Sequence, residues 1–387
     1  MKTLKIPDLR YGKKSLKVLK ELTFEDVLVV TDEVMKDTPH IEKVKHFLSN
    51  SGSLKIFSEI SPNPTRENVI EGAKVAKNLQ PDCILALGGG SVMDATKGIY
   101  VRYEHPQITW DEMYDENPFP SFTKGVTFIA VPSTSGTGAE CSLGAVISDE
   151  SVTPAKKEIM DDWKILPDIA ILDPEVPSTM PSRLTAITGV DALSHSIEAF
   201  AAVGADTFTN SLTTTAVETI FKNLPKAVAD GRDLDVRNKM HLASAMGAIA
   251  FDAAGLGVVH SLGHQCLEFG MPHGLAMGIL MPHVLKYNFL SSAEKYKKLA
   301  VYLGLVDRES SAEVAGNRLV YEIEDLISNI GLPLSFKEYG VKKDEFQRHV
   351  ENMAKSALND GNTAANPRQP SKKRELIELY WKAWDRE

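Results

Sequence analysis

Two pairs of polar side chains late in the sequence have the spacing of a helix turn. His195 follows Asp191 by four positions, His264 follows His260 by four, and a further histidine, His273, comes nine residues later. On a helix, a spacing of four places two side chains on one face, one turn apart. Imidazole and carboxylate groups without a thiolate suit a divalent first-row metal with an open coordination position, such as ferrous iron or zinc.

The same residues have a structural interpretation. A single Asp or His inside an apolar helix is usually a hydrogen-bonded core residue or a helix cap. Two pairs at helical spacing, followed by a third histidine, are less typical of unrelated core residues. Spacing alone leaves both interpretations open.

Composition limits the classes of protein that this chain can represent. The 387 residues are 43% hydrophobic and 25% charged, which is typical of a soluble globular protein of two or three domains. A net charge of −9 argues against nucleic acid or an anionic membrane as the main partner. No apolar run reaches the roughly 18 residues of a membrane span, and the first residues lack the apolar core of a secretion signal. Three scattered cysteines (Cys83, Cys141 and Cys266) fit a reducing compartment, so we expect a cytoplasmic protein.

The first half of the chain alternates short apolar runs with helical segments. Such continuous runs predict a parallel sheet that is covered on both faces. Crossover helices are expected over residues 68–78 and from residue 91 onward. The predicted strands are residues 26–32, 83–87, 126–131 and 169–172.

After Asp173 the pattern changes to helical periodicity alone. Three prolines at positions 174, 177 and 181 indicate a passage between domains. One helix is expected from an N-cap at Asp206 to a stop at Pro225, and a last amphipathic helix from a cap at Ser371. The sequence therefore predicts an α/β domain over residues 1–178 and an all-helical domain over residues 179–387.

A glycine run, Gly88-Gly89-Gly90-Ser91, follows a predicted strand and opens a helix. Glycines there let the backbone approach a phosphate, and the helix N-terminus supplies free N–H groups; a plain tight turn is the alternative. A second flexible loop, residues 132–140, follows the next strand and would face the same crevice, where open α/β sheets bind ligands. Two such loops predict a nucleotide-sized ligand.

Asp32 ends an earlier predicted strand. A carboxylate there can accept hydrogen bonds from the ribose hydroxyls of an adenosine and would repel a 2′-phosphate, which favours NAD over NADP. Capping of the following helix is an equally open role. The GxGxxG fingerprint is absent, so the pattern is not that of an ordinary Rossmann domain.

A series of short motifs runs in order along most of the chain, from about Val27 to Arg368. These motifs are Ser61-Pro62-Asn63-Pro64-Thr65, Gly88–Ser91 with Asp94 and Lys97, the Ser133–Glu140 loop, Leu172-Asp173-Pro174, Gly189–His195, Gly257–His264, Pro272-His273-Gly274, Pro282-His283 with Tyr287-Asn288, and Asn366-Pro367-Arg368. Through them the chain resembles the iron-containing (group III) alcohol dehydrogenases. The resemblance implies a dehydroquinate synthase-like fold, with a Rossmann-like dinucleotide-binding domain before an all-helical metal-binding domain.

The resemblance also implies roles for individual residues. The metal ligands would be Asp191, His195, His260 and His273, while His264 would line the site near the nicotinamide. The implied cofactors are NAD(H) and a divalent metal, iron in the first place with zinc as an alternative, and a homodimer is common in the family. Around the cofactor the implied residues are Gly88, Gly89, Gly90, Ser91, Asp94, Thr134, Thr137 and Lys157, with Phe251 beside the substrate.

The expected activity is the interconversion of a primary alcohol and a short aldehyde by hydride transfer with NAD(H), mainly as an aldehyde reductase. The metal would act as a Lewis acid, and His264 would either relay a proton or hold a group of the site in place through a hydrogen bond. Alternatives are a reductase of aldehydes with an anionic tail, a glycerol dehydrogenase, a lyase of the dehydroquinate synthase type, and a non-catalytic binding protein.

Overall fold

The four predicted apolar runs form the strands at the centre of a parallel sheet. The computed structural model describes residues 4–115, 117–152 and 156–385. By its internal contacts the chain divides into two units, Met1–Met180 with Arg232–His241, and Pro181–Gly231 with Leu242–Glu387. The sheet of the first unit has the order β1-β8-β5-β4-β2-β3, and all of its pairs are parallel. Its strands are β1 (Asp8–Tyr11), β2 (Asp26–Val30), β3 (Ser53–Phe57), β4 (Cys83–Gly88), β5 (Thr127–Pro132) and β8 (Ile169–Leu172).

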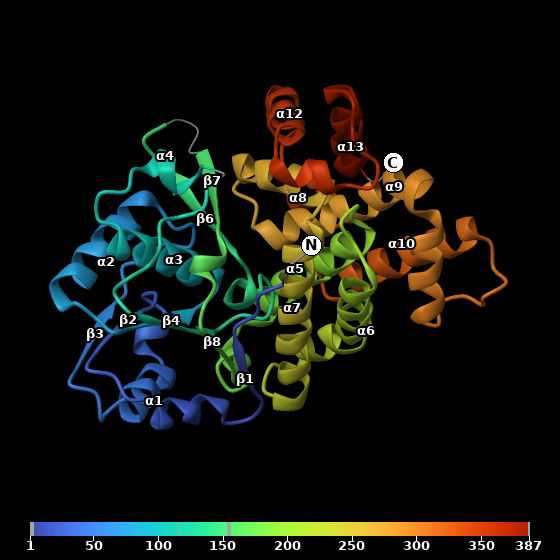
Figure 1. The fold of residues 1–387 in the computed structure, drawn as a ribbon. Helices are drawn as coiled ribbons and strands as arrows, with labels where there is room; N and C mark the ends of the chain where they lie inside the picture. Colours follow the sequence, from blue (N-terminus) through green and yellow to red (C-terminus); the bar gives the residue numbers. More distant parts are fainter. Residues whose placement is uncertain (1–3, 116, 153–155, 386–387) are drawn as a thin grey trace. The chain divides into compact units, whose positions relative to one another are not determined.

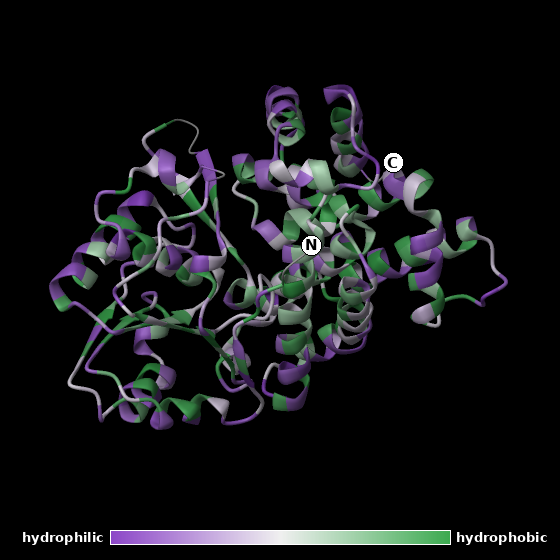
Figure 2. Ribbon diagram, in the orientation of Figure 1, coloured by the Kyte–Doolittle hydropathy of each residue, from purple (hydrophilic) through white to green (hydrophobic). Residues whose placement is uncertain are grey.

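Successive residues of the central strands enter two separate hydrophobic cores. In β2, Leu28 and Val30 pack with α2 (Arg66–Leu79) and α3 (Gly90–Glu104), whereas Val27 and Val29 pack with α1 (Pro39–Phe47). Figure 1 shows α2 and α3 on one side of this sheet and α1 on the other. Hydrophobic residues mark the central strands, while the outer helices mix both kinds (Figure 2). In the central strands, nearly every residue is buried on one face of the sheet or the other. This is why each of these strands appears in the sequence as a continuous apolar run.

Four strands lie outside the predicted set. β1 and β3 are the edges of the sheet, and the burial of β3 alternates with exposure, so neither has a continuous apolar run. β6 (Gly144–Asp149) and β7 (Lys156–Asp161) form a separate antiparallel pair. A short helix, α4 (Trp110–Met113), lies between α3 and β5 in the sequence.

Parallel strands bring their carboxyl ends to one edge of the sheet. β2 ends at Val30, β4 at Gly88 and β5 at Pro132, so the loops that follow all start from this edge. Asp32, the glycine run and the second flexible loop belong to these three loops.

The second unit is built from helices, and no strand follows Leu172 in the described part of the chain. A capping box at Asp206 starts α6, as predicted, but the expected stop at Pro225 is wrong because α6 continues to Ala229. Pro225 removes one N–H from the helix ladder, yet Leu224 and Ala227 on either side are buried and hold the helix in place. The helices that follow Leu172 are α5 (Ser182–Ala201), α6 (Thr207–Ala229), α7 (Leu234–Ala254), α8 (Val258–Gly263), α9 (His273–Tyr302), α10 (Ala312–Asn329), α11 (Phe336–Tyr339), α12 (Lys343–Leu358) and α13 (Lys373–Asp385). The first part of α7, up to His241, belongs to the first unit.

Among the described residues, no helix taken singly is both long and apolar enough to cross a bilayer. One bent pair, Leu234–Ala254 with Val258–Phe269, meets that test of length and composition with an angle of 103° between its halves.

Candidate metal centre and cofactor loops

Helix α5 carries two of the predicted ligands on one face. Most of this helix is buried on all sides, and Asp191 and His195 are only 3% and 6% exposed. A charged carboxylate is rarely buried in such a helix unless it is paired or binds a cation. His260, which is 1% exposed, reaches the same place from α8.

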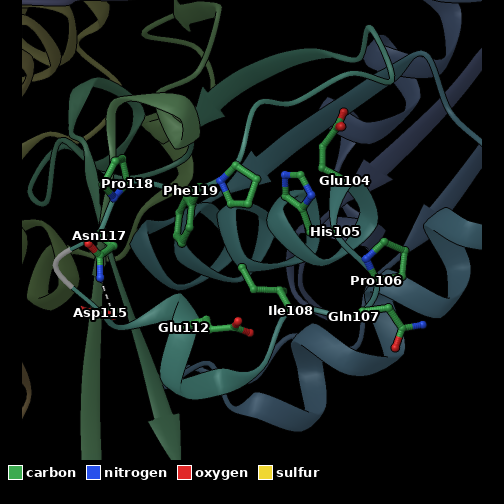
Figure 3. Close-up of a pocket in the computed structure, with 11 residues that line it drawn as sticks. Glu104, His105, Pro106, Gln107, Ile108, Glu112, Asp115, Asn117, Pro118 and Phe119 are labelled. Atoms are coloured by element: carbon green, nitrogen blue, oxygen red, sulfur yellow. Dashed lines mark hydrogen bonds between the residues drawn. The ribbon is translucent and has the colours of Figure 1, made fainter.

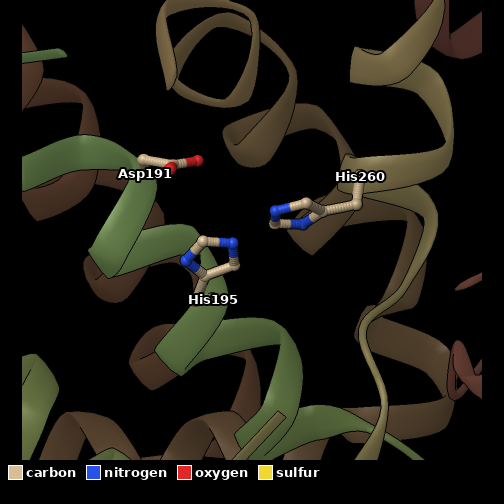
Figure 4. Close-up of side chains that lie close together, drawn as sticks. All are labelled: Asp191, His195 and His260. Atoms are coloured by element: carbon tan, nitrogen blue, oxygen red, sulfur yellow. The ribbon is translucent and has the colours of Figure 1, made fainter. Parts of the chain in front are cut away.

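The three side chains converge as a metal site requires. Ligand atoms of Asp191, His195 and His260 all lie within 4.8 Å of one another (Figure 4), and the rings of the two histidines stack with centroids 4.6 Å apart. The Nε2 atom of His260 is buried and meets no hydrogen-bond partner among the described residues. A buried imidazole nitrogen that lacks a partner carries a desolvation cost, and a cation at this point would remove it. The residues therefore fit a divalent metal.

His273, the first residue of α9, completes the predicted set of four. Its Nε2 lies 3.5 Å from Oδ1 of Asp191, and its ring centroid lies 5.3 Å from that of His260. Two ligands about 2.1 Å from a tetrahedral metal would be about 3.4 Å apart, so the Asp191–His273 distance matches one edge of such a site.

Gly274 explains why α9 can begin so close to α5. A Cβ atom at this position would lie 2.2 Å from the carbonyl oxygen of Ile187 and 3.0 Å from Cβ of Asp191. Only glycine leaves room for this approach, which carries His273 to the carboxylate of Asp191.

Glu198 is a residue of this site that the sequence analysis missed. It lies one turn beyond His195 on α5, and its Oε2 lies 2.5 Å from Nδ1 of His260. Burial raises the pKa of Glu198 to about 8, whereas backbone N–H groups that donate to its carboxylate oppose this shift. Burial also lowers the pKa of His260 to about 3, so this imidazole is neutral, as a metal ligand must be. The spacing of seven residues from Asp191 was the available sequence signal.

His264 is held in the same way by a residue far along the chain. Its Nδ1 lies 2.8 Å from Oδ2 of Asp360, and its ring stacks on His273 with centroids 5.4 Å apart. Burial alone would raise the pKa of Asp360, but the hydrogen bond and the charge of His264 lower it overall. Asp360 was not among the predicted residues, and no local motif indicates it.

Phe251 of α7 lies beside this cluster. Its ring centroid is 4.8 Å from that of His195, and it packs against an alanine-rich group that includes Ala199 and Ala254. An apolar ring therefore borders His195, one of the predicted ligands, and its contact with substrate stays a prediction.

In the first unit, the glycine run and the second loop lie against each other. A Cβ on Gly89 would be 3.2 Å from Cγ2 of Thr134, and one on Gly90 would be 2.8 Å from Cγ2 of Thr137. A Cβ on Gly88 would be 2.4 Å from the side chain of Val92. Side chains on these glycines would clash with Val92, Thr134 and Thr137, so glycine is what allows this close packing, and contact of the run with a phosphate stays a prediction.

The other predicted cofactor residues are held by neighbours of their own. The hydroxyl of Ser91 donates to the carbonyl of Pro62. Oδ2 of Asp94 accepts from the N–H of Val146 at 3.0 Å, and Lys157 of β7 interacts with Asp94 electrostatically. Burial raises the pKa of Asp94 to about 6 against the charges of nearby lysines. Their contacts with a dinucleotide stay predictions.

Asp32 caps the turn that follows β2. Its Oδ1 accepts from the N–H groups of Val34 and Met35 at 2.9 and 2.8 Å. The capping role is thus present, and contact of Asp32 with a ribose hydroxyl stays a prediction.

The first unit contains a cavity of about 650 Å³ that none of these residues lines. Its lining includes Glu104, Ile108, Glu112 and Phe119 (Figure 3). None of the predicted metal or cofactor residues borders it, so the convergence of side chains defines the candidate centre better than cavity size does.

Comparisons with known proteins agree with this geometry. Residues 7–174 match the family model described as iron-containing alcohol dehydrogenase, and residues 185–384 match its C-terminal counterpart. The chain is 37% identical to an NADPH-dependent butanol dehydrogenase of Clostridium saccharobutylicum, over 94% of this chain and 93% of that protein. It is 34% identical to a 1-propanol dehydrogenase of Citrobacter freundii, over 95% and 96%.

A solved structure of an iron-containing alcohol dehydrogenase from Thermococcus thioreducens superposes with a TM-score of 0.90 at 31% identity, covering all of both chains (100% of each). The predicted fold class is confirmed, as are the predicted class of activity and the predicted cofactors. This chain belongs to the iron-containing alcohol dehydrogenase family, enzymes that interconvert alcohols and aldehydes with NAD(H) and a divalent metal.

Proposed function

We propose that this enzyme reduces short unbranched aldehydes to primary alcohols with NADH, with its metal held by Asp191, His195, His260 and His273. The observation that carries the proposal is the buried convergence of the first three residues, with an unpartnered Nε2 on His260 among the described residues. His273 supports it through its short distance to Asp191.

The bound groups supply the reactive chemistry: a divalent cation acts as a Lewis acid toward the substrate oxygen, and the nicotinamide carries the hydride. A divalent cation held by three imidazoles and one carboxylate would keep a net positive charge, which would stabilise negative charge on the substrate oxygen.

His264 has the geometry of a proton carrier. Nδ1 is engaged by Asp360, which leaves Nε2 as the ring nitrogen that can take up or return a proton. The ring stays in place because it stacks on His273. We propose that Nε2 exchanges the proton of the alcohol with solvent.

The first unit supplies the cofactor residues. The backbone of Gly88–Gly90 and the threonines Thr134 and Thr137 would hold the pyrophosphate, with Ser91, Asp94 and Lys157 beside it. The negative charge of Asp32 favours NADH, although the butanol dehydrogenase relative is named for NADPH.

The substrate class rests on apolar contacts. Phe251 offers a ring next to His195, and two relatives are named for butanol and 1-propanol. We further propose that the enzyme is a cytoplasmic homodimer, in keeping with three buried cysteines that form no disulfide. Sedimentation velocity of the metal-loaded protein tests the dimer directly.

The test of the ligand set replaces His260 or His273 with alanine. Each variant, reconstituted with Fe²⁺ or Zn²⁺, is measured for bound metal and for NADH-dependent reduction of butanal. Loss of both properties is expected. Retention of full metal content and activity in either variant would remove that residue from the site. A panel of aldehydes, including one with an anionic tail, then tests the substrate class.

A further inference from the structure

A carboxylate outside the metal ligands is tied to one ligand and to the helix that carries it. Oε1 of Glu198 accepts from the N–H of Val259 at 2.7 Å, and Oε2 lies 3.3 Å from the N–H of His260. The same Oε2 lies 2.5 Å from Nδ1 of the His260 ring. One side chain thus fixes both the start of α8 and the orientation of its histidine.

The packing around Glu198 leaves little freedom for its carboxylate. Its side chain is 3% exposed, and a Cβ on Gly257 would lie 2.7 Å from Oε1. Asn366 approaches Gly257 from another side and accepts from the N–H of Val258 at 3.1 Å. The first N–H groups of α8 are therefore satisfied by two side chains from elsewhere in the fold.

We propose that Glu198 is a positioning residue for the metal, which keeps the proton of His260 on Nδ1 and so presents Nε2 as a lone pair to the ion. This inference rests on the proposed role of His260 as a ligand. Both oxygens of Glu198 already accept from backbone N–H groups, so the side chain faces Nδ1 as a hydrogen-bond acceptor, and an acceptor there keeps the ring proton on Nδ1. Such partners of ligating histidines influence metal affinity by about 10- to 100-fold.

The helix presents its ligands and this partner in register. Asp191, His195 and Glu198 are separated by four and then three residues, so one face of α5 supplies two ligands directly and orients a third through its neighbour. The contact between His264 and Asp360 has the same form, but His264 is not one of the proposed metal ligands.

The variant Glu198→Gln separates capping from positioning. A glutamine keeps the size of the side chain, and its amide oxygen still accepts from the N–H of Val259. Its amide nitrogen would donate to Nδ1 of His260 and place the ring proton on Nε2, where it competes with the metal. We expect metal dissociation constants, measured by chelator competition, to rise by about 10- to 100-fold.

The cobalt-substituted protein gives a readout that does not depend on activity. The visible absorption of Co²⁺ in Glu198→Gln should move toward that of His260→Ala, since both weaken the same bond. Asp360→Asn is the matched control: it makes the same change of carboxylate to amide beside His264, and its affinity and spectrum should equal those of the wild type.

The outcomes are distinct. Unchanged affinity and spectrum in Glu198→Gln would overturn the positioning role, because a capping role alone survives this substitution. Retention of metal by His260→Ala would instead contradict the proposed ligand set. If Glu198→Gln does not fold, Glu198→Asp, which shortens the side chain by one methylene, should still weaken binding by at least about threefold, and wild-type affinity there would also overturn the role.

Discussion

His260 and His264 each have a carboxylate partner, and in both rings the contact is made by Nδ1. Glu198 contacts Nδ1 of His260, and Asp360 contacts Nδ1 of His264. The pair therefore has equivalent supports, while the proposed tasks differ: one Nε2 binds the metal and the other carries a proton. Each support should affect only the task of its own histidine.

Replacement of Asp360 by asparagine should lower kcat for aldehyde reduction by about 10- to 100-fold while leaving bound metal unchanged, because the ring of His264 loses its fixed tautomer. Steady-state kinetics and metal analysis on one preparation check this. A fall in metal content equal to the fall in kcat would show that Asp360 supports the metal instead.

Asp32 both caps a turn and carries charge, and the two roles can be separated. In Asp32→Asn the side-chain oxygen still accepts from Val34 and Met35, but the negative charge is gone. We expect kcat/KM for NADPH relative to NADH to rise by about tenfold, equivalent to about 1.4 kcal/mol. An unaltered ratio would assign Asp32 to capping alone.

At the scale of elements, the start of α9 lies against α5, and this contact brings His273, the fourth proposed ligand, next to Asp191. Gly274→Ala should displace α9, since its Cβ would lie 2.2 Å from a backbone oxygen that cannot rotate away. We expect a loss of about 1–3 kcal/mol of stability, together with weaker metal binding. Gly278→Ala, one turn later on α9, is the control, because its nearest neighbour is a side-chain atom of Val190 at 3.1 Å. Thermal unfolding and metal titration of both variants test this, and equal effects would contradict it.

The elements also show what local sequence could and could not predict. The continuous apolar runs predicted β2, β4, β5 and β8, because strands buried on both faces need apolar residues at every position. The edge strands β1 and β3 lack that pattern, and Pro225 did not end α6 because burial of its neighbours outweighs the lost hydrogen bond.

Within the candidate site, local spacing predicted some residues, whereas contacts between distant parts of the chain could not be predicted from the sequence. Spacing on one helix placed Asp191 next to His195, since helix periodicity is local. Asp360 lies 96 residues beyond His264, so only the tertiary fold could reveal that contact. Glu198 was within reach of the helical pattern, but its role depends on where α8 lies, which no spacing indicates.

For the molecule as a whole, folding stability should depend on pH through His241. Its Nδ1 lies 2.8 Å from Oγ of Ser135, and burial lowers its pKa to about 3. Between that value and its ordinary 6.5, the unfolded chain binds a proton that the folded chain does not. As far as His241 is concerned, the free energy of unfolding is therefore highest above pH about 6.5 and decreases progressively as the pH falls toward 3.

His241→Gln should flatten this dependence. Melting temperatures of metal-free protein between pH 4 and 7 are the measurement, with metal removed so that its ligands do not dominate. Parallel curves for the variant and the wild type would contradict the assignment.

Metal should also stabilise the fold as a whole. A ligand that binds only the folded state raises stability by RT ln(1 + [L]/Kd), about 2.7 kcal/mol at 100 times Kd. The melting temperature should therefore rise with Zn²⁺ concentration in the wild type, and His260→Ala should lose most of this dependence.

In the proposed site one carboxylate and three imidazoles surround a single ion. Zinc K-edge X-ray absorption of the Zn²⁺-loaded wild type measures this ligand set. We expect a shell of nitrogen and oxygen ligands at about 2.0–2.1 Å with the multiple scattering of three imidazoles. A sulfur shell at about 2.3 Å, or scattering from fewer than three imidazoles, would contradict it.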